Sequence, residues 1–171
     1  MTARLLALFC AALALASAPA ARAVEAGVEA PECALAPLGG APGYSLKQFR
    51  GKVVFVDFWS SWCPPCAKSF SFLNEMDREF KDKGLHVIGV NLDESPEDAQ
   101  TFLAQHPAHF AVATDASQQC AKDFDVKAMP SSYLIDRAGV IRHVHHGFRP
   151  EEAKEFKVLA ERLLAENPAS K

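Results

Sequence analysis

The stretch that most constrains this chain is an apolar segment followed by two closely spaced cysteines. Residues 53–59 read Val-Val-Phe-Val-Asp-Phe-Trp, a pattern typical of a strand buried on both faces in the middle of a parallel sheet. Cys-Pro-Pro-Cys occupies residues 63–66, where an amphipathic helical pattern begins. A helix N-terminus favours a thiolate over a thiol, because its free N–H groups and its dipole present positive charge. The stretch therefore predicts a redox-active dithiol.

The two cysteines differ in their expected roles. Cys63 starts the helix, so it is the candidate attacking thiol and is expected to be the more exposed of the pair. Cys66, one turn later, is placed to resolve a mixed disulfide formed at Cys63. Pro64 and Pro65 remove two N–H donors from the first turn, so we expect the thiolate to be only modestly favoured.

Asp57 is the one acidic residue of the apolar segment. An ionised carboxylate there would cost several kcal/mol without partners, so its pKa is expected to rise. A carboxyl of raised pKa is suited to moving a proton to or from Cys66 during exchange. The alternative is that the strand end is wetter and that Asp57 caps a turn.

Metal-site interpretations of the two cysteines have little support. A zinc site would need a second ligand pair, and haem attachment would need a histidine where the chain has Ala67. His143 and His145 would share one face of a strand, with His146 on the other. Because half-exposed strand histidines are the ordinary outcome, we assign no metal and no cofactor.

Residues 1–23 have the features of a secretory signal peptide. Arg4 precedes an apolar run from Leu5 to Leu15, and Ala-Arg-Ala at residues 21–23 predicts cleavage after Ala23. The run is too short for a membrane span, so we expect an exported, periplasmic protein without stable membrane insertion of the mature chain. Removing Arg4 and Arg22 leaves 16 of the 18 Lys and Arg against 21 Asp and Glu, a formal charge of −5. This balance, without a basic cluster, gives no indication of nucleic-acid binding.

The rest of the chain predicts an extension followed by one domain. Residues 24–43 are rich in Ala, Gly and Pro and indicate an extension or linker rather than a core element. Residues 44–171 are expected to form an α/β domain, a central mixed sheet flanked by helices. Strands are expected at 53–59, 85–92, 110–114, 131–136 and 140–146, and helices at 64–83, 96–106, 117–124 and from residue 150 onwards. Gly84 is expected just after the end of the first helix, and Ser95 is expected to cap the second, with Pro96 at its first position and Asp98 completing a capping box.

The segment 57–66 resembles the active-site segment of thioredoxin, and residues 46–164 are similar to exported thioredoxin-like proteins of the TlpA/ResA/CcmG (DsbE) type. Further matches lie at residues 51–54 and 129–136. The resemblance implies a thioredoxin fold and disulfide exchange outside the cytoplasm, often as a reductase that receives electrons through a membrane protein. Pro130 matches the family's cis-proline, whose loop faces the cysteine pair and receives the substrate backbone.

Three residues depart from patterns within that resemblance. Ser69 stands where many cytochrome-maturation members carry glutamate, and Asp57 stands where many carry asparagine. Gly89 falls near the position of the lysine that accompanies the acid in thioredoxin. Cytochrome c biogenesis is therefore one of several roles compatible with the chain, and the resemblance does not define the client.

Two further groups of residues carry expectations. Trp62, Pro64, Met129 and Pro130 are candidates for substrate contact, whereas Trp59 is expected to pack in the core. Cys33 and Cys120 remain after the motif, and an oxidising compartment favours a structural disulfide between them. The alternative is two unrelated thiols, because connectivity does not follow from sequence.

Together these observations predict an exported thiol:disulfide oxidoreductase that reduces protein disulfides and is itself reduced by a membrane electron donor. An oxidase or isomerase with the same residues would differ only in the net direction of exchange. A redox-inert or copper-delivering binding module on the same scaffold is the alternative from a different class.

Overall fold

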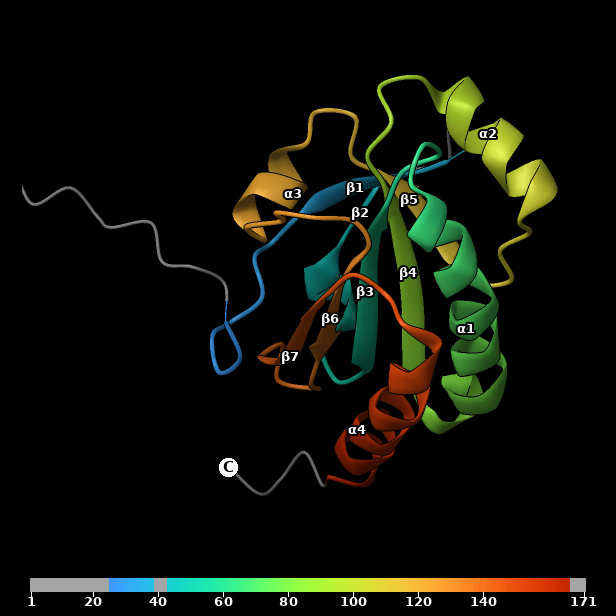
Figure 1. The fold of residues 1–171 in the computed structure, drawn as a ribbon. Helices are drawn as coiled ribbons and strands as arrows, with labels where there is room; N and C mark the ends of the chain where they lie inside the picture. Colours follow the sequence, from blue (N-terminus) through green and yellow to red (C-terminus); the bar gives the residue numbers. More distant parts are fainter. Residues whose placement is uncertain (1–24, 39–42, 167–171) are drawn as a thin grey trace, which may run out of the picture.

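A seven-stranded sheet runs through the part of the chain that the structure describes (Figure 1). The computed structural model describes residues 25–38 and 43–166, so the predicted signal peptide and its cleavage site lie outside it. From β3 onwards, strands and helices alternate in the order predicted from the sequence. The strands are β1 (Ala34–Pro37), β2 (Tyr44–Ser45), β3 (Val53–Trp59), β4 (Leu85–Asn91), β5 (Ala111–Thr114), β6 (Ser131–Ile135) and β7 (Ile141–His146). The α-helices are α1 (Pro64–Phe80), α2 (Pro96–Gln105), α3 (Gln119–Asp123) and α4 (Ala153–Ala165).

Strand β3, which leads to the dithiol, lies inside the sheet. The strand order is β2-β1-β5-β4-β3-β6-β7, and all seven residues of β3 are buried. β3 pairs in parallel with β4, from Val53–Leu85 to Trp59–Asn91, and antiparallel with β6. The sheet is therefore mixed, as the thioredoxin resemblance implies.

Alternate residues of β3 face two separate cores. Val53, Phe55 and Trp59 pack with apolar side chains of α1, α2 and α4. Val54, Val56 and Phe58 pack on the other face, where α3 and the N-terminal segment lie. Figure 1 shows α1 and α4 together on one side of the sheet and α3 on the other. This alternation places Asp57 on the face that carries the helix of the dithiol.

Helix α1 ends close to its predicted boundary. Its apolar positions Phe70, Leu73, Met76 and Phe80 are buried, and a short 3-10 turn at residues 81–83 follows. Gly84 then has φ 101°, a left-handed conformation that suits glycine after a helix. None of the helices within the described ranges is both long and apolar enough to cross a membrane.

The prediction that residues 24–43 contribute no core element is wrong for their described part. β1 pairs with β5 in an antiparallel manner and extends the sheet, and both Cys33 and Leu35 are buried. Leu35 is the one buried residue of the four in this strand, and Ala and Pro surround it, so the apolar signal is weak. The segment belongs to the domain.

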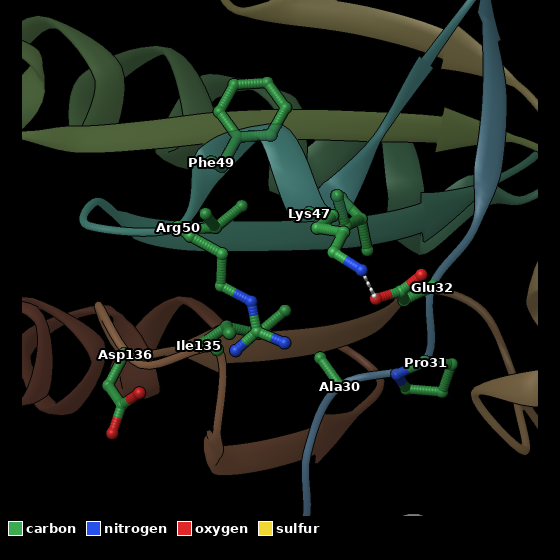
Figure 2. A pocket seen from close by; sticks show the side chains of 11 residues that line it. Ala30, Pro31, Glu32, Lys47, Phe49, Arg50, Ile135 and Asp136 are labelled. Atoms are coloured by element: carbon green, nitrogen blue, oxygen red, sulfur yellow. Dashed lines mark ion pairs between the residues drawn. The ribbon is translucent and has the colours of Figure 1, made fainter.

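Charged residues hold this segment against the rest of the domain (Figure 2). Lys47 pairs with Glu32 at 2.9 Å, and Arg50 pairs with Glu29. Both basic residues belong to the short 3-10 helix at Leu46–Phe49 and its C-cap, which precede β3. The N-terminal segment is therefore anchored to the element that leads into the central strand.

One local prediction at the start of α2 is also wrong. Ser95 is the N-cap residue and Pro96 the first helical residue, as expected. The predicted capping box between Ser95 and Asp98 does not form, because the Ser95 hydroxyl donates to Glu97 at 2.7 Å.

Candidate active site at the start of α1

The two cysteines of the motif occupy the N-cap and the first turn of α1. Cys63 is the N-cap residue, and Pro64 and Pro65 open the helix, where a missing N–H is tolerated. The backbone N–H of Cys66 points at Cys63 Sγ, with N and S 3.3 Å apart. The two sulfurs are bonded to each other. Cys63 is 4% exposed and Cys66 fully buried, so the order of exposure is as expected although both are shielded.

The turn before Cys63 is held by the carboxylate of Asp93, a residue that the sequence analysis did not single out. Asp93 accepts the Ser61 backbone N–H at 3.0 and 3.2 Å, and its other contacts are with Asn91. Asp93 lies two residues after the end of β4, whose last residue pairs with the last residue of β3. Because the carboxyl ends of neighbouring parallel strands meet at one edge, polar residues after two such strands are the signal that could have found it.

Asp57 lies within the β3 layer on the face covered by α1. Its carboxyl is buried, Oδ1 accepts the Ser132 hydroxyl at 2.5 Å, and Oδ2 has no hydrogen-bond partner. Burial raises the pKa of Asp57 from its ordinary value of 3.8 to about 7, against the lowering effect of the Ser132 hydrogen bond. At neutral pH this carboxyl therefore exists in both protonation states, as a proton carrier requires.

The Met129–Pro130 loop lies next to the turn that carries the dithiol. The peptide bond before Pro130 is cis, and Pro130 is buried whereas Met129 is partly exposed. Ser60, just after β3, donates its hydroxyl to Met129 Sδ at 3.2 Å. The structure thus brings together two segments that are about 70 residues apart in the sequence.

A groove of about 550 Å³ runs beside this turn. Trp62 and Met129 contribute apolar surface to it, and Trp62 is 69% exposed, which is unusual for a large apolar side chain. Acidic residues after β4 and in α2 contribute charge. The lining residues are Ser60, Trp62, Leu92, Asp93, Glu94, Ser95, Asp98, Gln118 and Met129. Pro64 is exposed but does not line this groove.

The second cysteine pair lies on the opposite face of the sheet. Cys33 and Cys120 are bonded to each other, with their Cα atoms 5.3 Å apart, and each is 3% exposed. They pack among the apolar side chains of the second core and join the segment before β1 to α3. They do not belong to the dithiol site.

The strand histidines lie where the sequence placed them. His143 and His145 of β7 stack with ring centroids 6.2 Å apart, and both pack edge-on against Phe156 of α4. His145 also pairs with Glu152 at 2.9 Å. Within residues 25–38 and 43–166, no three side chains of the metal-ligating kinds converge on one point.

The fold and the dithiol at the start of α1 define a thioredoxin-like thiol:disulfide oxidoreductase, and comparisons with known proteins agree. The chain belongs to the Redoxin family, which matches residues 25–163. It is 35% identical over 134 residues to the thiol-disulfide oxidoreductase ResA of Bacillus thuringiensis subsp. konkukian, covering 78% of this chain and 77% of that protein. The Bacillus subtilis ResA is 30% identical over 128 residues, covering 75% and 71%.

Solved structures show the same relationship. A crystal structure from Chlorobium tepidum, described as a "putative Thiol:disulfide interchange protein DsbE", superposes with a TM-score of 0.79 at 42% identity. The superposition covers 83% of this chain and 99% of that one. The similarity to proteins of the TlpA/ResA/CcmG type is therefore present in sequence and in fold.

Proposed function

We propose that this protein is exported and reduces disulfide bonds in other proteins with the Cys63–Cys66 pair. The observation that carries the proposal is the position of Cys63 as N-cap of α1, on the sheet face that also holds the buried Asp57 carboxyl. The names of its relatives support disulfide exchange with protein substrates. The direction, the compartment and the residue roles are part of the proposal.

The weak stabilisation that the Cys63 thiolate receives supports the reducing direction. One backbone N–H, from Cys66, reaches its sulfur, and the two prolines of the first turn have none to offer. A dithiol becomes a strong oxidant when its reduced form is strongly stabilised, so a weakly stabilised thiolate favours a reductant.

The exchange has two steps. The Cys63 thiolate attacks one sulfur of the substrate disulfide, forms a mixed disulfide and expels the first substrate thiolate. Asp57, in its ionised form, takes the Cys66 proton, and the resulting thiolate attacks Cys63 Sγ and expels the second substrate thiolate. Asp57 passes its proton to the second substrate thiolate and water protonates the first, so the products are a reduced substrate with two thiols and an enzyme with a Cys63–Cys66 disulfide.

Substrate reaches the sulfurs along the groove beside Trp62. Trp62 and Met129 supply apolar contact, Pro64 is exposed beside Cys63, and the cis-Pro130 loop receives the substrate backbone. A membrane protein outside the cytoplasm then returns two electrons to the enzyme. The sequence of residues 1–23 supports export, and so does the bonded Cys33–Cys120 pair, because such bonds persist in oxidising compartments.

Reduction of insulin disulfides tests the activity, and thiol alkylation in cells tests its direction. The reduced protein should reduce insulin catalytically, and Cys66→Ser should accumulate mixed disulfides with exported proteins. In cells, the Cys63–Cys66 pair should be mostly reduced. A mostly oxidised pair would instead support an oxidase, and a protein without insulin activity would support a binding module.

A further inference from the structure

Two buried polar atoms on β3 lack partners, and they are complementary. Among the residues that the structure describes, Asp57 Oδ2 and Trp59 Nε1 are the buried side-chain polar atoms without a hydrogen bond. One is an acceptor and the other a donor. The residues are two positions apart on one strand, so both side chains project from the same face. Unsatisfied buried groups are rare, and each calls for a physical reason.

The Trp59 indole leans towards the side of Asp57 that faces β4. Gly89 is the residue paired with Asp57 across β3 and β4. A Cβ atom added to Gly89 would lie 3.2 Å from Trp59 Nε1 and 2.8 Å from Phe110 Cε2. The indole N–H therefore occupies the space that a side chain at position 89 would fill. Ring contacts with Phe70 and Phe102, at centroid distances of 5.0 and 4.9 Å, hold the indole there.

The remaining neighbours of Asp57 supply one neutral donor and no cation. On the β6 side Ser132 donates to Oδ1. From α1, the two cysteines of the motif lie in the core on the same face of the sheet as Asp57. On β7, His145 lies opposite Ser132 in the strand register, and His143 lies on the same face. The His145 ring in turn contacts the Glu152 carboxylate, next to α4. On the side towards β4, the neighbours named above are Gly89, the Phe110 ring and the Trp59 indole, and of these only the indole carries a side-chain donor.

We propose that Trp59 is a positioning residue whose indole N–H donates to Oδ2 of the ionised Asp57, directly or through one water molecule. A hydrogen bond to a charged acceptor is stronger than one to a neutral acceptor, so the contact gains importance when Asp57 loses its proton. Ser132 and Trp59 then hold the two carboxylate oxygens from opposite sides. This role rests on the proposed function, in which Asp57 takes the Cys66 proton.

The disulfide form of the unmodified protein gives the first test, because its bonded cysteines do not titrate. The chain has two tryptophans, so ¹⁵N-labelled protein should show two indole N–H signals. The Trp59 signal should shift with pH with a midpoint near the Asp57 pKa of about 7. Asp57→Asn should abolish that shift, and the exposed Trp62 signal should not follow it. A Trp59 signal that ignores the Asp57 titration would overturn the proposal.

Trp59→Phe gives the second test, because phenylalanine keeps an aromatic ring and removes the donor. The titration midpoint of Asp57, followed by its ¹³C carboxyl signal, should rise by about one pH unit, a tenfold change in the ionisation ratio. Trp62→Phe is the matched control and should leave the midpoint in place. An unchanged midpoint in folded Trp59→Phe protein would contradict the role. Neither test measures activity, so a failure of the proposed enzymatic function would show separately in the insulin assay.

Discussion

The two cysteine pairs of this protein are almost equally buried, yet their surroundings differ. Cys63 and Cys66 are 4% and 0% exposed, and Cys33 and Cys120 are 3% each. The first pair spans three residues at a helix start, beside a groove, the cis-Pro130 loop and a buried acid. The second spans 87 residues and packs in an apolar core. The exposed fraction therefore does not distinguish the two pairs, whereas the N-cap position, the cis-Pro130 loop and a buried carboxyl of raised pKa do.

The largest expected effect is on the rate of insulin reduction, which should depend on the Cys63–Cys66 pair and not on the Cys33–Cys120 pair. Cys63→Ser should lower insulin reduction on the order of 10³-fold or more, because no thiolate remains to attack. Cys120→Ser, the matched change in the other pair, should leave the rate per folded molecule nearly unchanged. Equal losses in the two variants would show that the comparison is wrong.

The second prediction concerns Asp57, the buried acid on the sheet face that carries the dithiol. Between pH 4 and 7 the unfolded chain ionises Asp57 while the folded protein keeps it protonated. The Asp57 contribution to the free energy of unfolding, taken as the difference between wild type and Asp57→Asn, should therefore be largest below pH 4, fall by about 3–4 kcal/mol as pH rises to 7, and level off above it. Asp57→Asn should lack this slope, which urea titrations across the pH range would reveal. Equal slopes in both proteins would place the ionisable group elsewhere.

The third prediction concerns the contribution of the Cys33–Cys120 bond to the free energy of unfolding. Cys33→Ala with Cys120→Ala should lower the free energy of unfolding by about 2–4 kcal/mol, because the bond closes a long loop in the unfolded chain. Denaturant unfolding measures this loss. A Cys66→Ala variant lacks the Cys63–Cys66 bond. That bond joins cysteines only three positions apart, so its loss should lower the free energy of unfolding by less than the loss of the Cys33–Cys120 bond.

A smaller effect is expected on the rate of insulin reduction when the Asp57 carboxyl is removed. Asp57→Asn should slow insulin reduction about tenfold at pH 7, since a positioned acid or base contributes at least that much to proton transfer. The loss should diminish as pH rises and Cys66 ionises without help. A uniform loss at every pH would assign Asp57 a structural role.

The smallest effect concerns the groove. Trp62→Ala should raise KM for a protein disulfide about threefold to tenfold, because its exposed ring offers apolar contact, and should barely change reduction of a small disulfide. Equal changes for both substrates would remove Trp62 from substrate contact.

Local patterns predicted much of this structure. The apolar run of β3, the periodicity of α1 and the turn glycine Gly84 each report on their own segment, and all three lie where expected. The location of the dithiol at a helix start followed from the same reasoning.

Features made by distant segments could not be predicted in this way. β1 is identified by its pairing with β5, because its Ala- and Pro-containing sequence carries little apolar signal. Ser132 and Asp93 acquire their roles from neighbours on other strands. The significance of Gly89 depends on the packing of Trp59 and Phe110, which no single segment encodes.

The bond between Cys33 and Cys120 makes residues 33–120 a covalent ring, and the dithiol lies inside it. After a single protease cut in any loop of that ring, the two fragments would stay covalently linked, and the mass of the molecule would increase only by one water. The fragments would separate only under a reductant strong enough to reach the buried bond. The dithiol of this oxidoreductase thus lies within a covalent loop whose closing bond is buried on the opposite face of the sheet.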